Sequence, residues 1–233
     1  MKKIIYTLII VFITGSVKAQ DVEFSLGADI VSSYIWRGAY QTGAAVQPGM
    51  NLDISGFSLS AWGSTPFQGT AKEVDFTASY KIAGLSFIIS DYWCADEQTF
   101  KYYTYNSRST GHLFEGTISY KLPCEGFPLT LSWNTIFAGQ DYKVPDSEGH
   151  RDRAYSSYIS ASYPFSIKAV ALELSIGITP WEGMYADDAT VIHAGIKASK
   201  TLEITDNFSL PVFAEIITNP KSEGIFFVFG VSL

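Results

Sequence analysis

The sequence lacks any long hydrophobic run after residue 20. This excludes a membrane-spanning helix there, because such a helix needs about 20 apolar residues. Charged residues are also scarce, at 17%, whereas roughly 25% is usual for soluble domains. Aromatic residues are abundant instead, at 15%. Together these features favour a β-structure that either lies in a membrane or is secreted.

Basic residues and recognisable catalytic motifs are also scarce. The chain has 16 Lys and Arg against 23 Asp and Glu, which gives a formal net charge of −7. Because so acidic a protein would repel a phosphate backbone, we expect no nucleic-acid partner. No phosphate-binding glycine-rich loop, CxxC or HExxH motif occurs. We therefore expect no cofactor, no metal and no enzymatic activity.

Residues 1–19 have the composition of a secretory signal peptide. Lys2 and Lys3 precede an apolar core at residues 4–13, and Val17-Lys18-Ala19 ends in the small residue that a signal peptidase requires. Cleavage after Ala19 would leave residues 20–233 as one domain. Without Lys2, Lys3 and Lys18, the formal charge of −7 becomes −10. We therefore expect export across the inner membrane.

From Glu23 onward, apolar and polar residues alternate with the period of a β-strand, most clearly in VDFTASYKI at residues 74–82. Most of the alternating segments contain about 10 or 11 residues, the length that a tilted strand needs to cross a bilayer. We predict twelve such segments, at residues 22–36, 44–54, 57–66, 72–82, 85–94, 112–122, 129–139, 155–165, 169–180, 190–203, 208–218 and 224–233.

The predicted links alternate between short and long. The links after the even-numbered segments are short, as in Ser55-Gly56 and Ala83-Gly84, whereas those after odd-numbered segments are mostly longer, as at residues 95–111 and 140–154. This layout is typical of outer-membrane barrels. We therefore predict an all-β fold: a transmembrane, antiparallel, up-and-down barrel of about 12 strands with short periplasmic turns and longer external loops.

The two cysteines fall at different levels of such a barrel. Cys94 ends an outward-running strand, and Cys124 lies in a periplasmic turn. A full strand of about 10 residues separates them, roughly 25–30 Å at about 3.3 Å per residue. Since a disulfide requires Cα atoms within about 7 Å, we predict two free thiols.

In a membrane barrel, lipid-facing side chains are apolar and lumen-facing ones are polar. Most of the charged residues that the alternation turns toward the lumen are acidic, so a passage would favour cations or neutral polar solutes. Cross-strand pairing of these charges would instead fill the lumen, because twelve strands lie between filled barrels and wide channels. The sequence leaves an open and a plugged lumen equally favoured. The predicted lumen-facing residues are Asp29, Arg37, Asp53, Glu73, Asp75, Lys81, Glu115, Lys121, Glu173, His193, Lys197 and Glu215.

Two groups of residues raise the question of catalysis or metal binding. His193 could face Glu173 across neighbouring strands, as a base and its orienting group. No nucleophile motif accompanies them, so hydrogen bonding in the lumen is the favoured role. The loop HRDR at residues 150–153, beside Asp146 and Glu148, is interpreted as a solvated charge cluster.

Aromatic residues concentrate at segment ends, where rings commonly mark the membrane–water interface. This predicts a girdle that includes Tyr34, Trp36, Trp133, Tyr158 and Tyr185. The YYTY run at residues 102–105 lies in a loop, and either interfacial contact or stacking on sugar rings would explain it.

The stretch SSYIWRGAYQ, residues 32–41, ends the first predicted strand. The alternation places Trp36 on the lipid face and Arg37 at the lumen mouth, with Asp29, Glu73 or Asp75 as candidate partners. Gly38 then allows the chain to turn into the first external loop. Arg37 is either a strut at the rim or a constriction residue, and the strut is the favoured interpretation.

Residues 25–43, SLGADIVSSYIWRGAYQTG, and residues 45–64, AVQPGMNLDISGFSLSAWGS, carry a family resemblance. The features are a strand ending Y-x-W-R-G, a Q-P-G that opens the return strand, and G-F-S-L-x-x-W-G-S in the third. In these features the chain resembles the TorF porin family. The resemblance implies an outer-membrane barrel and a pore, and it implies no catalytic residues.

The leading prediction is an outer-membrane, porin-like channel of a Gram-negative bacterium for passive passage of small solutes. Its expected partners are outer-membrane lipid, the barrel-assembly machinery during insertion, and a small-molecule solute that the sequence does not identify. One alternative is an outer-membrane barrel enzyme or adhesin that acts on lipids or surface glycans. Another is a soluble secreted β-domain that binds a ligand within an apolar core.

Overall fold

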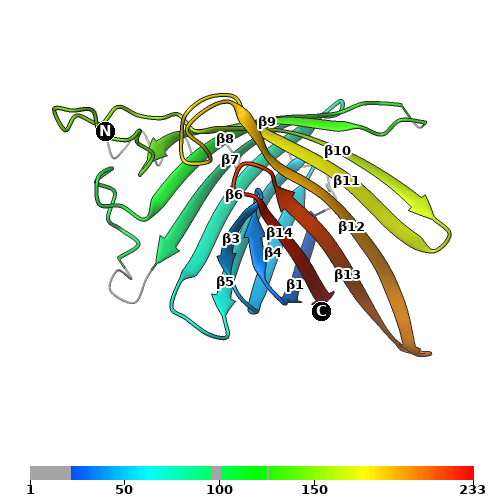
Figure 1. Cartoon of the computed structure of the whole chain (residues 1–233). Helices are drawn as coiled ribbons and strands as arrows, with labels where there is room; N and C mark the ends of the chain where they lie inside the picture. The colour runs from blue at the N-terminus through cyan, green and yellow to red at the C-terminus, as the bar shows by residue number, and fades with distance from the viewer. Residues whose placement is uncertain (1–21, 96–100, 125) are drawn as a thin grey trace.

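A computed structural model of the protein describes residues 22–95, 101–124 and 126–233, so the predicted signal peptide lies outside the described residues. These ranges form a closed antiparallel barrel of twelve strands and a separate two-stranded hairpin (Figure 1). The barrel strands are β1 (Val22–Val31), β4 (Ala45–Ile54), β5 (Phe57–Pro66), β6 (Lys72–Ile82), β7 (Leu85–Ala95), β8 (His112–Lys121), β9 (Thr130–Gly139), β10 (Ser157–Ile167), β11 (Val170–Thr179), β12 (Thr190–Thr205), β13 (Phe208–Asn219) and β14 (Gly224–Ser232). The hairpin strands are β2 (Tyr34–Trp36) and β3 (Ala39–Thr42).

Each barrel strand pairs with its neighbours in chain order, and β1 closes the barrel against β14. The predicted all-β, up-and-down fold is therefore confirmed, with eleven of the twelve predicted segments lying within about two residues of an observed strand. In the described ranges, no helix is long and apolar enough to cross a membrane.

The turns at one end of the barrel are tight. Ala83 and Gly84 both have positive φ angles, 50° and 83°, which is the backbone conformation of the two-residue turns that match strand twist. A Cβ on Gly84 would lie 2.9 Å from the carbonyl oxygen of Lys121, so glycine also permits close approach to the next strand.

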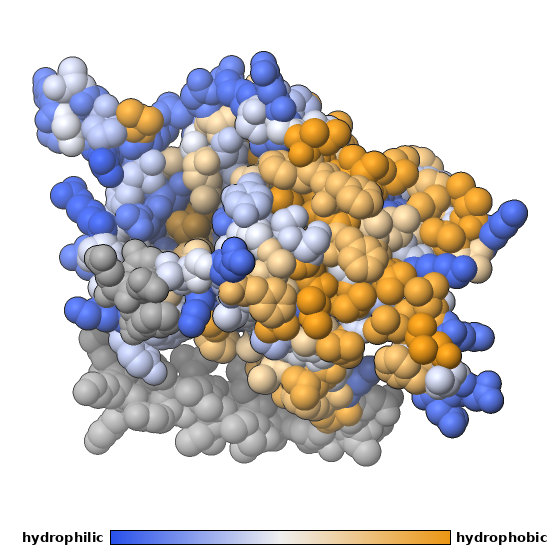
Figure 2. All heavy atoms as spheres, turned by 60° about the horizontal axis from the view of Figure 1, so that its bottom comes forward, coloured by the Kyte–Doolittle hydropathy of each residue, from blue (hydrophilic) through white to orange (hydrophobic). Residues whose placement is uncertain are grey.

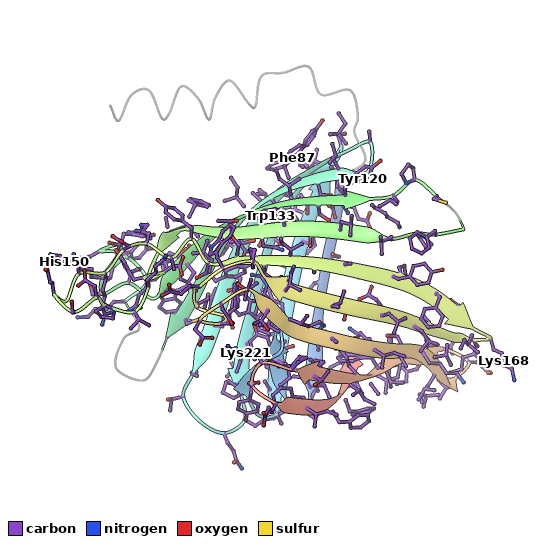
Figure 3. All side chains as sticks on the ribbon, turned by 45° about the horizontal axis from the view of Figure 1, so that its top comes forward. Phe87, Tyr120, Trp133, His150, Lys168 and Lys221 are labelled. Carbon is purple, nitrogen blue, oxygen red and sulfur yellow. The ribbon has the colours of Figure 1, made fainter. Side chains whose placement is uncertain are left out.

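Apolar side chains cover the outer wall of the barrel. Leu26 is 73% exposed and Phe227 is 68% exposed, and Figure 2 shows hydrophobic residues gathered over the wall with hydrophilic residues at the projecting ends. Phe87, Tyr120 and Trp133 point away from the barrel (Figure 3). An exposed apolar surface of this extent in a protein with a polar interior matches the inverted pattern of a transmembrane barrel.

One predicted segment is wrong. Residues 22–36 do not form a single strand, because β1 ends at Val31 and Tyr34–Trp36 belongs to the β2–β3 hairpin. At the break, the backbone and hydroxyl of Ser32 bond to the backbone of Phe229, after which the chain leaves the barrel wall. Cys94 and Cys124 are both free thiols.

Candidate functional site in the barrel lumen

The β2–β3 hairpin folds inward and crosses the lumen. It leaves the wall between β1 and β4, yet its tip contacts three strands elsewhere in the barrel. Arg37 pairs with Glu115 on β8, Asn219 on β13 donates a hydrogen bond to the Gly38 carbonyl at 3.2 Å, and Gly38 packs against Ile192 on β12. The connection between β1 and β4 is therefore a structural element inside the barrel.

The hairpin tip depends on a tight turn at Arg37-Gly38. Their φ angles are 51° and 79°, and Trp36 pairs with Ala39 on either side of the turn. A Cβ on Gly38 would lie 2.0 Å from the Ile192 carbonyl oxygen. Glycine is thus required both by the backbone conformation and by the close contact with β12.

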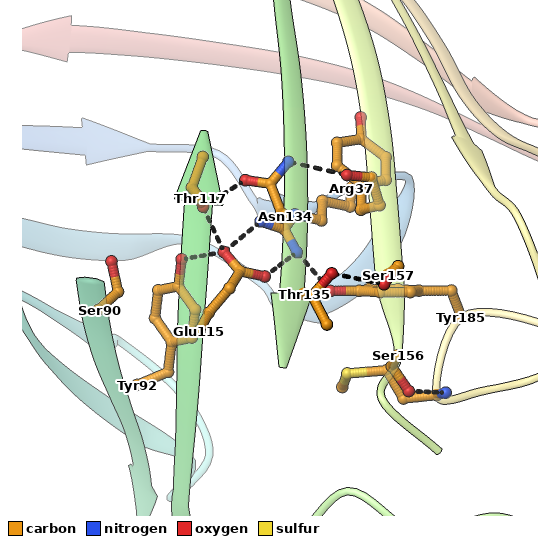
Figure 4. Close-up of polar contacts among 12 residues, drawn as sticks. Arg37, Ser90, Tyr92, Glu115, Thr117, Asn134, Thr135, Ser156, Ser157 and Tyr185 are labelled. Atoms are coloured by element: carbon orange, nitrogen blue, oxygen red, sulfur yellow. Dashed lines mark hydrogen bonds and ion pairs between the residues drawn. The ribbon is translucent and has the colours of Figure 1, made fainter. Parts of the chain in front are cut away.

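A bidentate ion pair joins the tip to the opposite wall (Figure 4). Arg37 Nη1 lies 2.6 Å from Glu115 Oε2, and Arg37 Nη2 lies 2.8 Å from Glu115 Oε1. The Tyr92 hydroxyl donates a further hydrogen bond to Oε1 at 2.9 Å. The Glu115 side chain is 1% exposed and that of Arg37 is 11% exposed, so the pair is largely removed from water. Two parallel hydrogen bonds in one plane fix the orientation of the Arg37 guanidinium and also strengthen the ion pair.

Aromatic rings surround the Arg37 guanidinium. Its carbon lies 4.6 Å from the Trp36 ring centroid, 4.7 Å from that of Tyr158 and 5.6 Å from that of Tyr185. An Arg37 N–H also donates to the Tyr185 hydroxyl. We call Arg37, Glu115, Tyr92, Tyr158 and Tyr185 the latch. Cation–π contacts in a desolvated setting add to the ion pair.

Burial alone would lower the pKa of Arg37, but the contacts with Tyr185 and Glu115 outweigh burial and place it above the ordinary value. Burial raises the pKa of Tyr185 above its usual range, although Arg37 acts in the opposite direction. The latch therefore places a charged guanidinium beside a neutral phenol.

The hairpin lies in a layer of buried residues that fills the half of the lumen nearer the longer connections. Ala45 is fully buried, and Ile136 and Ile192 are each 1% exposed. Two cavities remain beside the hairpin: one of about 200 Å³, lined by Trp36, Arg37, Tyr92, Cys94 and Tyr185 among others, and one of about 100 Å³ on the side of Tyr34 and Thr42. Glu73 and Cys94 line both cavities.

On the other side of this layer, the lumen is more open. The charged side chains of Lys81, Lys121 and Glu173 are exposed, and small hydroxyl residues between them are half-buried. The lumen thus consists of a filled layer around the hairpin and a polar, accessible half that ends at the short turns.

The structure brings together only some of the predicted lumen residues. Lys197 lies directly opposite Glu173 on one side and Glu215 on the other. Elsewhere, Glu73 lies opposite Ser64 and Cys94, Asp75 opposite Trp62 and Tyr92, Asp29 opposite Gln47 and Ser232, Asp53 opposite Glu23 and Ser58, Lys81 opposite Ser86, and Lys121 opposite Thr130.

Three predictions about Arg37 and its neighbours are wrong. Arg37 does not pair with Asp29, Glu73 or Asp75, because the inward hairpin carries it to Glu115 instead. Trp36 does not face lipid but packs against the rings of Tyr92 and Tyr185, at centroid distances of 5.6 and 5.7 Å. Three other predicted girdle residues are also internal: Tyr34 packs on Trp62 at 5.4 Å, and Tyr158 and Tyr185 contact Arg37.

His193 does not pair with Glu173. Its Nε2 lies 2.7 Å from the Ser175 hydroxyl, while its Nδ1 is buried without a hydrogen-bond partner. A catalytic base would need a group at Nδ1 to orient the ring, so this contact is not a complete triad. His150 is solvent-exposed beside Asp146 and Glu148, and the described residues include no group of three or more ligands placed to hold a metal.

A second polar cluster lies on the outer side of the wall, below the loop that contains the YYTY run. The His112 ring bridges Asp91, 2.7 Å from Nδ1, and the Tyr102 carbonyl, 2.6 Å from Nε2. The Tyr102 hydroxyl also donates to Asp91 at 3.0 Å. His112 is fully buried, whereas Tyr103 and Tyr105 are 86% and 56% exposed. The cluster ties the loop to β7 and β8.

No protein-family model and no curated protein matches the chain, so the TorF resemblance remains a prediction. Among solved structures, the NanC porin in a rhombohedral crystal form is similar over 89% of this chain and 98% of its own, with 9% identity and a TM-score of 0.49. The KdgM porin in complex with disordered oligogalacturonate is similar over 91% and 98%, with 9% identity and a TM-score of 0.47. The Salmonella typhi OmpF complex with daunomycin is similar over 91% and 97%, with 8% identity and a TM-score of 0.41. These similarities assign neither a solute nor a functional residue to this chain.

Proposed function

We propose that the protein is an outer-membrane channel of low conductance for small solutes, in which the β2–β3 hairpin restricts the passage. The observation that supports this most is the inward hairpin, held by the latch across a closed barrel. The apolar outer wall suits a lipid bilayer, and the predicted signal peptide suits export to the outer membrane.

The size of the barrel supports a restricted passage. Barrels of about eight strands are filled by side chains, whereas 16 or more strands leave a wide aqueous channel. Twelve strands lie between these two cases, which suits a lumen that a hairpin narrows. Arg37 acts in this proposal as a tie that keeps the hairpin in the lumen, not as a strut of the outer rim.

Recording single channels in planar bilayers tests this function. The wild-type protein is expected to give small current steps, and a variant with residues 33–42 replaced by a short Gly-Ser linker is expected to give clearly larger ones. Heat-dependent migration on gels checks that both barrels are folded. A folded, hairpin-shortened barrel that carries no current would overturn the proposed channel.

A further inference from the structure

Rows of hydroxyl side chains line the accessible half of the lumen. Ser86, Ser119, Ser132 and Ser160 lie directly opposite one another on the four neighbouring strands β7 to β10. A second row on β9 to β11 consists of Thr130, Ser162 and Ser175. We call these seven residues the hydroxyl rows.

The hydroxyl rows face the lumen. They alternate along each strand with outer-wall side chains such as Ile118 and Trp133, which are 55% and 48% exposed, and Trp133 points away from the barrel in Figure 3. All seven residues are half-buried and none is fully buried. The Ser132 and Ser160 hydroxyls share a hydrogen bond at 2.7 Å, and the Ser175 hydroxyl bonds to His193, so a solute at these positions exchanges with existing hydrogen bonds. Adjacent strands lie about 4.8 Å apart, so four neighbouring serines present a continuous hydroxyl surface.

Charged side chains lie beside the ends of the rows and not between their members. The first row is bounded by Lys81 on β6 and by Gly177 on β11, and the second begins beside Lys121. At the β11 end, Glu173 lies two residues from Ser175 on the same face of the strand. Lys197 on the neighbouring β12 lies between Glu173 and Glu215, which balances part of this acidic charge. A solute that follows the rows therefore meets neutral hydrogen-bonding groups, with fixed charges only beside the ends of the rows.

This chemistry selects a class of solute. A polar molecule that enters a narrow lumen loses hydrogen bonds to water, and each loss is costly unless the wall replaces it. A hydroxyl both donates and accepts and can rotate to suit its partner. Passage also requires binding weak enough to allow release, which neutral hydroxyls provide better than fixed charges.

We propose that the hydroxyl rows form a selective path for small uncharged polyhydroxylated solutes, such as polyols and sugars. This inference rests on the proposed channel function and names its solute class. The rows exchange hydrogen bonds with the solute hydroxyls, one strand after another. A solute that lacks hydroxyl groups and has no hydrogen-bond donor can only accept from the rows, so it makes fewer such contacts.

Two triple variants whose replaced side chains have nearly the same shape test the proposed solute class. Ser119, Ser132 and Ser160 are all replaced by Thr in one variant and all by Val in the other, because Thr and Val have nearly the same shape and differ in the hydroxyl. The variants are reconstituted in liposomes in the hairpin-shortened background, and osmotic swelling is measured with arabinitol and with glycine betaine, a zwitterion without hydroxyls. Single-channel conductance is recorded in parallel.

The Val triple is expected to pass arabinitol about tenfold more slowly than the Thr triple, which corresponds to about 1.4 kcal/mol of lost hydrogen bonding. Ion conductance is expected to match between the two, and the glycine betaine rates are expected to differ less than the arabinitol rates, because this solute accepts hydrogen bonds but donates none. Equal arabinitol rates in two conducting variants would overturn the solute class and leave the channel intact. If a triple fails to fold, Ser132→Thr and Ser132→Val give the same comparison at one position. If the hairpin-shortened parent carries neither ions nor solutes, the channel itself is refuted.

Discussion

Replacing Glu115 by Gln tests the latch most sharply, because it changes one charge in a nearly constant shape. The carboxylate accepts two hydrogen bonds from Arg37 and one from Tyr92, all between 2.6 and 2.9 Å. In E115Q, the buried guanidinium loses its only ion-pair partner among the described residues. Removing one member of a buried pair typically costs about 3–5 kcal/mol.

We expect this loss to destabilise the position of the hairpin in the lumen rather than the barrel itself, because the barrel wall keeps all its backbone hydrogen bonds. The affected equilibrium is between a hairpin held in the lumen (seated) and one that has left its contacts (released). At about 1.36 kcal/mol per tenfold, the ratio of seated to released hairpin should fall by about two to four orders of magnitude. The Asn219 hydrogen bond to Gly38, worth about 1 kcal/mol, would not compensate. Single-channel recording of E115Q should therefore show larger or more frequent openings than the wild type.

A double variant provides the control. Arg37→Met combined with E115Q leaves no unpaired charge, so it should release the hairpin less than E115Q alone, and the double-mutant cycle should give a coupling energy well above 1 kcal/mol. Heat-dependent gel migration confirms that each barrel is folded. A folded E115Q barrel with wild-type conductance would refute the latch, as would strictly additive effects.

Three further predictions address the hairpin turn, the outer wall and the external loop. Gly38→Ala should release the hairpin as E115Q does, since its Cβ would lie 2.0 Å from the Ile192 carbonyl oxygen; wild-type currents from this variant would contradict the seating of the tip. Ile89 faces lipid and is 59% exposed, so Ile89→Arg should lower the free energy of unfolding in bilayers by about 2–4 kcal/mol. Ile88→Arg, on the lumen side of the same strand, should lower it clearly less. Equal losses would contradict the assignment of the two faces. Asp91→Ala removes the acceptor shared by His112 and Tyr102, so added protease should cut residues 101–111 faster than in the wild type, and an unchanged cleavage rate would show that the cluster does not hold the loop.

The barrel could be predicted from the sequence because its signals are local. Period-two alternation, strand lengths near those needed to span a bilayer and short turns such as Ala83-Gly84 depend only on neighbouring residues. The polar face of VDFTASYKI already placed Asp75 and Lys81 together, and the observed register keeps them on one side of β6.

The latch could not be predicted because its contacts span long sequence separations. Arg37 and Glu115 are 78 residues apart, and Arg37 and Tyr185 are 148 apart. Alternation continued through Ser32 and Ser33 and made Trp36 look like an interfacial ring, since period two does not reveal that a strand has left the wall. The one local signal was Arg37-Gly38, a pair suited to a tight hairpin turn between two short apolar stretches.

Chemical modification of the Cys94 thiol tests most directly whether the β2–β3 hairpin restricts a passage through this barrel. Cys94 is exposed and lines the cavities beside the hairpin. In a Cys124→Ser background, single-channel current is recorded before and after addition of a charged methanethiosulfonate reagent, with Cys94→Ser as the control. Modification of Cys94 is expected to reduce the current, and the Cys94→Ser control is expected to show no change. A current that persists unaltered after mass spectrometry shows complete modification of Cys94 would contradict the restriction of the passage by the hairpin.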